Sequence, residues 1–116
     1  MTDNMKTFVM KKIGQTSIME KPIPTDPGPN GAIIKTTKAL ICTSDTHTVN
    51  GGIGERENLT LGHEAVGFVH KLGQCVTHVK PGNRVAINAI TPDYKCDNCQ
   101  RGCSSQCEQM LGGWKF

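Results

Sequence analysis

The sequence has few aromatic residues and no long apolar run, and both shortages restrict the folds open to it. Three Phe, one Tyr and one Trp stand against thirteen Gly and six Pro in 116 residues. Glycine and proline interrupt regular elements and suit turns, so this composition disfavours long helices and favours short strands. A chain of this length builds one hydrophobic core at most. We therefore expect a mostly β domain, or part of one.

Signals that would direct the chain to a membrane or to nucleic acid are also missing. Residues 1–6 contain no apolar signal-peptide core, and no segment approaches the roughly 18 apolar residues of a membrane-spanning helix. The net charge of +3 is spread along the chain without a block of Lys or Arg. We expect a cytoplasmic protein that binds neither membranes nor nucleic acid.

The order of apolar segments and turn residues predicts a small antiparallel barrel. Residues 7–20 have the pattern of a hairpin about a turn at 12–15. The proline-rich residues 21–29 should form an extended connector, because proline lacks the N–H that a strand ladder needs. Further strands are expected at residues 32–42, 65–72 and 84–90, a short helix at residues 43–49, and a polar, Cys-rich loop from residue 91.

Four of the six cysteines, Cys96, Cys99, Cys103 and Cys107, lie within twelve residues. In a reducing compartment such a cluster is better explained by metal binding or redox chemistry than by structural disulfides. Four thiolates satisfy a tetrahedral zinc ion, and the metal would hold together a loop that has no core of its own. The sequence predicts a structural zinc site in a lobe at residues 94–110, with free thiols or reversible disulfides as the alternative.

A second set of metal-binding residue types lies earlier in the chain, at Cys42, His63 and Glu64. A thiolate and a neutral imidazole are ligands that zinc favours, and a catalytic zinc needs only three protein ligands. Taken alone, the first two residues would more often be a small buried thiol and a hydrogen-bonded turn residue. The segments around them favour the metal.

Three segments in this order, Cys42–His47, Leu61–Gly67 and Val79–Ala86, resemble the zinc-containing medium-chain alcohol dehydrogenases. The similarity is strongest to the tetrameric secondary-alcohol branch and runs from about Met5 to the last residue. It implies part of a GroES-like catalytic domain, in other words a partial antiparallel barrel with a short helix and a Cys-rich loop. The lobe departs from the family, because its thiols are spaced C-x2-C-x3-C-x3-C where related enzymes with a structural zinc have C-x2-C-x2-C-x7-C.

The resemblance also implies roles for individual residues. Cys42 and His63 become ligands of a catalytic zinc, and Glu64 a neighbour able to join or leave the coordination shell. Ser44 and His47 become a proton relay, and Trp114 lines the substrate pocket. The ordinary alternatives are a helix-capping serine, a solvated histidine and a core tryptophan.

The implied activity is the NAD(P)-linked interconversion of small secondary alcohols and ketones by a homotetramer. No G-x-G-x-x-G follows a predicted strand, so we expect residues 1–116 to be the N-terminal part of the catalytic domain without a Rossmann domain. Such a fragment should be inactive and should tend to self-associate. Two alternatives are a zinc-stapled GroES-like binding or assembly module without catalysis, and a zinc-free reductase of the same superfamily.

Overall fold

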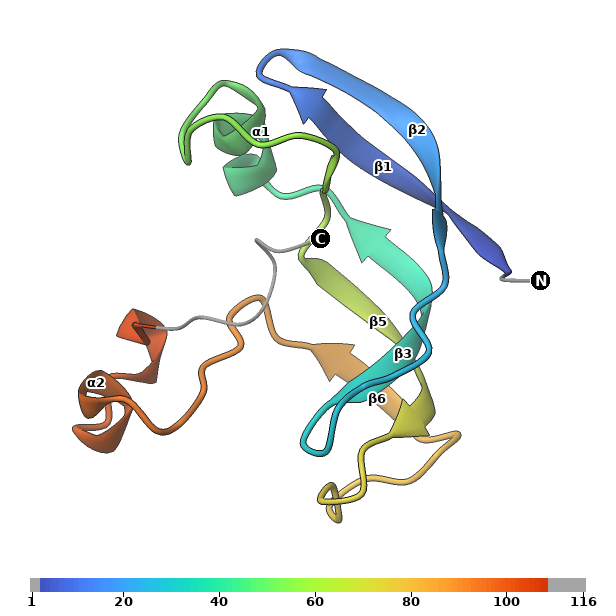
Figure 1. Ribbon diagram of the computed structural model, residues 1–116, viewed down its shortest axis with the longest axis vertical. Helices are drawn as coiled ribbons and strands as arrows, with labels where there is room; N and C mark the ends of the chain where they lie inside the picture. The colour runs from blue at the N-terminus through green and yellow to red at the C-terminus, as the bar shows by residue number, and fades with distance from the viewer. Residues whose placement is uncertain (1–2, 109–116) are drawn as a thin grey trace.

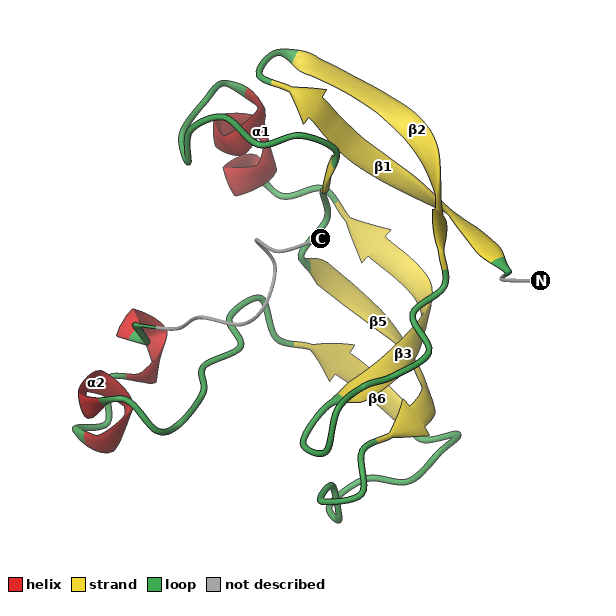
Figure 2. Cartoon of the chain, viewed as in Figure 1, coloured by secondary structure: helices red, strands yellow, loops and turns green. Residues whose placement is uncertain are grey.

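The computed structural model describes residues 3–108, which form two three-stranded antiparallel sheets with short helices at their margins (Figure 1, Figure 2). One sheet has the order β2-β1-β4, from strands Gln15–Pro22, Asn4–Lys12 and Leu59–Thr60. The other has the order β3-β5-β6, from strands Ala32–Leu40, Glu64–Leu72 and Arg84–Ile87. The helices are α1 (Thr43–Val49), α2 (Asp97–Gln100) and a 3-10 turn at Ser104–Gln106. The predicted mostly β class is confirmed, and no helix in residues 3–108 is long and apolar enough to cross a membrane.

The first sheet is built on the predicted hairpin, which runs further than expected. Strand β2 continues to Pro22, which pairs with Asn4, so the prediction of an extended connector from Lys21 was wrong for its first two residues. Proline is tolerated there because β2 is an edge strand with only β1 beside it, and an edge residue can lack an N–H without breaking a ladder on both sides.

The core described by the structure lies between the first sheet and α1. Met10 of β1, Leu59 of β4 and Leu61 are buried together, and Val49 and Ile53 pack against them. Burial of each large aliphatic side chain stabilises the fold by about 1.5–3 kcal/mol. This packing fixes α1 against the first sheet, so the residues at the start of α1 are held in place.

In the second sheet, β5 leaves no room for a side chain at Gly67, where β3 packs against it. A Cβ on Gly67 would lie 2.2 Å from the carbonyl oxygen of Lys35, so only glycine fits at this position. Strand β3 ends at Leu40 instead of residue 42, because Cys42 leaves the sheet to become the N-cap of α1. Strand β6 likewise ends at Ile87, three residues earlier than expected.

Candidate metal centres

The pairing of β3 with β5 brings the first set of predicted ligands together. Leu40 pairs with Glu64, so Cys42, two residues beyond the end of β3, faces His63, one residue before β5. Gly62 has φ +89°, a conformation that favours glycine and turns the chain just before His63. Ligand atoms of Cys42, His63 and Glu64 all lie within 4.8 Å of one another.

A buried carboxylate, Asp45 of α1, ties these two chain ends together. Its Oδ2 accepts a hydrogen bond from the backbone N–H of Cys42 at 3.0 Å, and its Oδ1 accepts one from the backbone N–H of Gly62 at 3.4 Å. The same Oδ1 lies 3.3 Å from Nδ1 of His63. Asp45 was not singled out from the sequence, although its place three residues after the N-cap, typical of a capping box, was a usable signal.

The position of Asp45 determines which ring nitrogen of His63 is available to a metal. An Nδ1–H that donates to a carboxylate places the lone pair of the ring on Nε2, the atom that would then bind a metal, and such carboxylate–histidine pairs are usual behind zinc ligands. Together with the Cys42 thiol and the Glu64 carboxylate, this imidazole gives three donors and leaves one position open. That donor set fits a catalytic zinc ion.

Of the two proposed relay residues, Ser44 lies beside the ligand group and His47 lies on the exposed side of its helix. Ser44 Oγ lies 3.3 Å from Cys42 Sγ and 3.0 Å from His63 Nε2, so its hydroxyl is beside the ligand group. His47 is exposed on α1, and among residues 3–108 its side chain has no hydrogen bond with Ser44. Trp114 lies outside the described residues.

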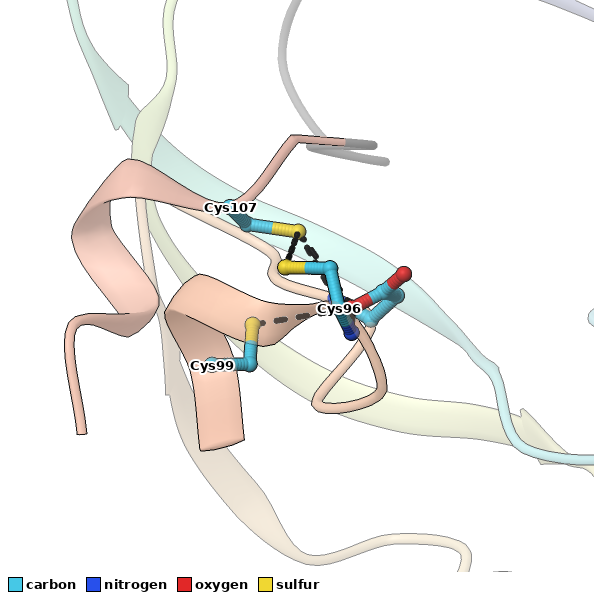
Figure 3. A group of neighbouring side chains, drawn as sticks. Cys96, Cys99 and Cys107 are labelled. Atoms are coloured by element: carbon cyan, nitrogen blue, oxygen red, sulfur yellow. Dashed lines mark hydrogen bonds between the residues drawn. The ribbon is translucent and has the colours of Figure 1, made fainter. Parts of the chain in front are cut away.

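The second group of ligands is in the lobe formed by α2 and the 3-10 turn, which stands apart from both sheets (Figure 1). The side chains of Cys96, Cys99 and Cys107 converge there (Figure 3), and a carboxylate oxygen of Asp93 completes a group whose ligand atoms lie within 4.8 Å of one another. Cys103 is exposed and is not part of this group among residues 3–108. The structure therefore gathers three of the four predicted thiols and adds one carboxylate.

The pKa shifts in the lobe act in both directions: those of Asp93 and Cys96 favour the charged form, and that of Cys99 favours the neutral form. Backbone N–H groups of Lys95 and Cys96 lower the pKa of the Asp93 carboxyl to about 2, so it is an anion at neutral pH. Backbone N–H groups of Glu108 and Cys99 lower the pKa of the Cys96 thiol, whereas desolvation raises the pKa of the Cys99 thiol to about 12. A metal ion would offset this desolvation, because it stabilises thiolates directly.

Comparison with known proteins identifies the family. Residues 28–115 match the alcohol dehydrogenase GroES-like domain. The NADP-dependent isopropanol dehydrogenase of Thermoanaerobacter brockii and a probable one of Mycoplasma pneumoniae are each 50% identical over 113 residues, 97% of this chain and 32% of the relative. Zinc dependent alcohol dehydrogenase 2 from Streptococcus pneumonia, in its apo form, superposes with a TM-score of 0.83 at 32% identity, covering 95% of this chain and 32% of that one. The chain thus spans about a third of the length of these relatives. It belongs to the alcohol dehydrogenase GroES-like domain family.

Proposed function

We propose that this chain supplies the zinc-binding part of the catalytic domain of a cytoplasmic NADP-dependent dehydrogenase that interconverts secondary alcohols and ketones. The observation that carries the proposal is the Cys42, His63 and Glu64 group, held by Asp45 and touched by the Ser44 hydroxyl. The names of the 50% identical relatives, isopropanol dehydrogenases that use NADP, supply the substrate class and the cofactor.

The ligand group and its neighbours have separate tasks in this reaction. Zinc bound by Cys42, His63 and Glu64 would act as a Lewis acid that lowers the pKa of an alcohol hydroxyl. Asp45 keeps the His63 ring in one orientation and one tautomer. In this proposal Ser44 accepts the proton of the alcohol and His47, exposed later on the same helix, passes it to water; the position of the Ser44 hydroxyl within 3.3 Å of two ligand atoms supports the first of these roles.

A non-catalytic binding module is the weaker explanation of this site. A structural zinc is enclosed by four protein ligands, whereas this group offers three and has a hydroxyl beside it. The neighbouring sheet carries exposed Leu40, Val66 and Ile87 around a shallow, mostly apolar hollow that includes Glu64. Such a face is suited to being covered by further protein, either a cofactor domain or other subunits of a homotetramer.

A chimera tests this function. Residues 1–116 would replace the matching third of the Thermoanaerobacter brockii enzyme, whose remaining two thirds would supply whatever this chain lacks. We expect the chimera to oxidise 2-propanol with NADP⁺ at a rate within about tenfold of the parent enzyme, because an intact ligand group preserves transition-state stabilisation. A chimera that folds, binds NADP⁺ and zinc, and yet fails to turn over would contradict the proposal.

The Asp45 carboxylate, which lies beside Nδ1 of His63, leads to a second prediction for the same chimera. Asp45→Asn keeps an oxygen that can accept from Cys42 N–H but removes the charge facing Nδ1 of His63. We expect zinc affinity or kcat/KM to fall by about 10–100-fold, as for other partners of zinc ligands. Competition with a chromophoric chelator measures the affinity. Asp26→Asn is the matched control, since Asp26 also accepts a backbone hydrogen bond but lies in an exposed turn; equal losses in both variants would show that Asp45 acts only as a cap.

A further inference from the structure

We infer that the lobe is a metal site of three thiolates and one carboxylate, in which Asp93 and not Cys103 is the fourth ligand beside Cys96, Cys99 and Cys107. This site is separate from the Cys42, His63 and Glu64 group and does not depend on the proposed dehydrogenase activity. Cys103 then remains outside the coordination shell as an accessible thiol.

Three of the distances within the group match the edges of a zinc tetrahedron, and all of its ligand atoms lie within 4.8 Å of one another. With Zn–S near 2.3 Å and Zn–O near 2.1 Å, tetrahedral geometry requires about 3.8 Å between two sulfurs and about 3.6 Å between a sulfur and an oxygen. Cys96 Sγ and Cys107 Sγ are 3.9 Å apart. Asp93 Oδ1 lies 3.6 Å from Cys99 Sγ and 3.4 Å from Cys107 Sγ. Four donor atoms thus surround a space of the size that one zinc ion needs.

Local backbone structure holds Asp93 in this position. Its Oδ1 accepts hydrogen bonds from the N–H groups of Lys95 at 2.8 Å and Cys96 at 3.1 Å, so the carboxylate is folded back over the start of α2. Its own N–H donates to Cys107 Sγ at 3.3 Å, which joins the two ends of the lobe. The carboxylate is therefore oriented toward the sulfurs before any metal binds, as is expected for a preformed ligand.

The spacing of the residues supports the same ligand set. Asp93-x2-Cys96-x2-Cys99-x7-Cys107 has the C-x2-C-x2-C-x7-C spacing that the family resemblance implies for a structural zinc, with aspartate in the first position. The pattern of the cysteines alone does not show this agreement, because that pattern begins at Cys96 and includes Cys103 as a ligand. Carboxylate oxygen is an accepted zinc donor, and together with three thiolates it gives the same total charge as four thiolates.

Cobalt substitution tests the inference on the 116-residue chain. Cys42→Ser and His63→Ala would first remove the other metal group, so that Co²⁺ reports the lobe alone. We expect one Co²⁺ per chain with a tetrahedral visible spectrum and a sulfur-to-cobalt charge-transfer band. In this background Cys103→Ser should leave the band unchanged, and Asp93→Asn should weaken Co²⁺ binding by more than about tenfold. Asp93→Cys should strengthen the band by about a third, since it raises the thiolates from three to four.

Alkylation of the metal-loaded chain gives a readout that needs no substitution in the lobe. With zinc bound, iodoacetamide should label Cys103 and Cys75, both exposed, and leave Cys96, Cys99 and Cys107 unlabelled until a chelator is added. Loss of the metal in Cys103→Ser with retention in Asp93→Asn, protection of Cys103 by zinc, or a chain that binds no metal at the lobe would each overturn the inference.

Discussion

The isolated 116-residue chain is expected to reduce no measurable NADP⁺ with 2-propanol, even when it is saturated with zinc. Hydride transfer requires the nicotinamide to be held against the alcohol, and positioning of this kind supplies about 7–11 kcal/mol of barrier reduction, or about 10⁵–10⁸ in rate. No G-x-G-x-x-G is present in the sequence to cradle the pyrophosphate, and the chain covers about a third of its dehydrogenase relatives. The measurement is absorbance of the reduced cofactor, together with calorimetric titration of NADP⁺.

The chimera with the Thermoanaerobacter brockii enzyme is the positive control for this experiment, because it contains the same 116 residues joined to a cofactor-binding part. Saturable turnover by the isolated chain would show that the nicotinamide is bound by residues within it. The proposal that the activity needs a longer protein would then be wrong, whereas the proposal of a catalytic group at Cys42, His63 and Glu64 would stand.

Removing the Cys42 thiol from the proposed catalytic group should have the next largest effect. In the chimera, Cys42→Ser replaces a thiolate with a hydroxyl that binds zinc poorly, and a Lewis acid is worth several kcal/mol of transition-state stabilisation. A loss of about 4 kcal/mol corresponds to about 10³ in kcat/KM, which we expect for oxidation of 2-propanol. Zinc per subunit should fall in parallel, as measured by mass spectrometry of the metal.

Cys75→Ser is the control for that substitution, because Cys75 is exposed and is not part of either ligand group within residues 3–108. It should leave both turnover and metal content unchanged. If Cys42→Ser kept full activity, zinc would have to be held without this thiol, and the assignment of the catalytic group would fail.

Most of the strands could be predicted from the sequence, because their apolar residues are bounded by glycine, proline and turn residues. The two-residue strand β4 (Leu59–Thr60) was missed, since so short a pairing with β1 leaves no periodic pattern. Its existence depends on Leu59 being buried beside Met10, a contact between residues far apart in the chain. Local patterns carry no information about such a contact.

From the sequence, Glu64 was singled out together with the thiols and the imidazole, but neither Asp45 nor Asp93 was. Cysteine and histidine are rare enough that their clustering is itself a signal, whereas aspartate is common in turns and helix caps. Asp45 and Asp93 each accept ordinary backbone hydrogen bonds of that kind, and only the fold shows that each also faces a ligand group. Carboxylates that lie beside a group of metal ligands are therefore harder to find from the sequence than the cysteines and histidines that would bind the metal.

The register between β3 and β5 limits how this segment can change during evolution. Cys42 meets His63 only because Leu40 pairs with Glu64, and that pairing includes irregularities between Ile33 and Ile34 and between Thr36 and Lys38. A residue inserted or deleted beyond these points would shift one ligand by about 3.3 Å along its strand and turn its side chain to the other face. In related sequences, insertions and deletions should therefore occur mainly in the connection between β5 and β6 and rarely within the paired strands.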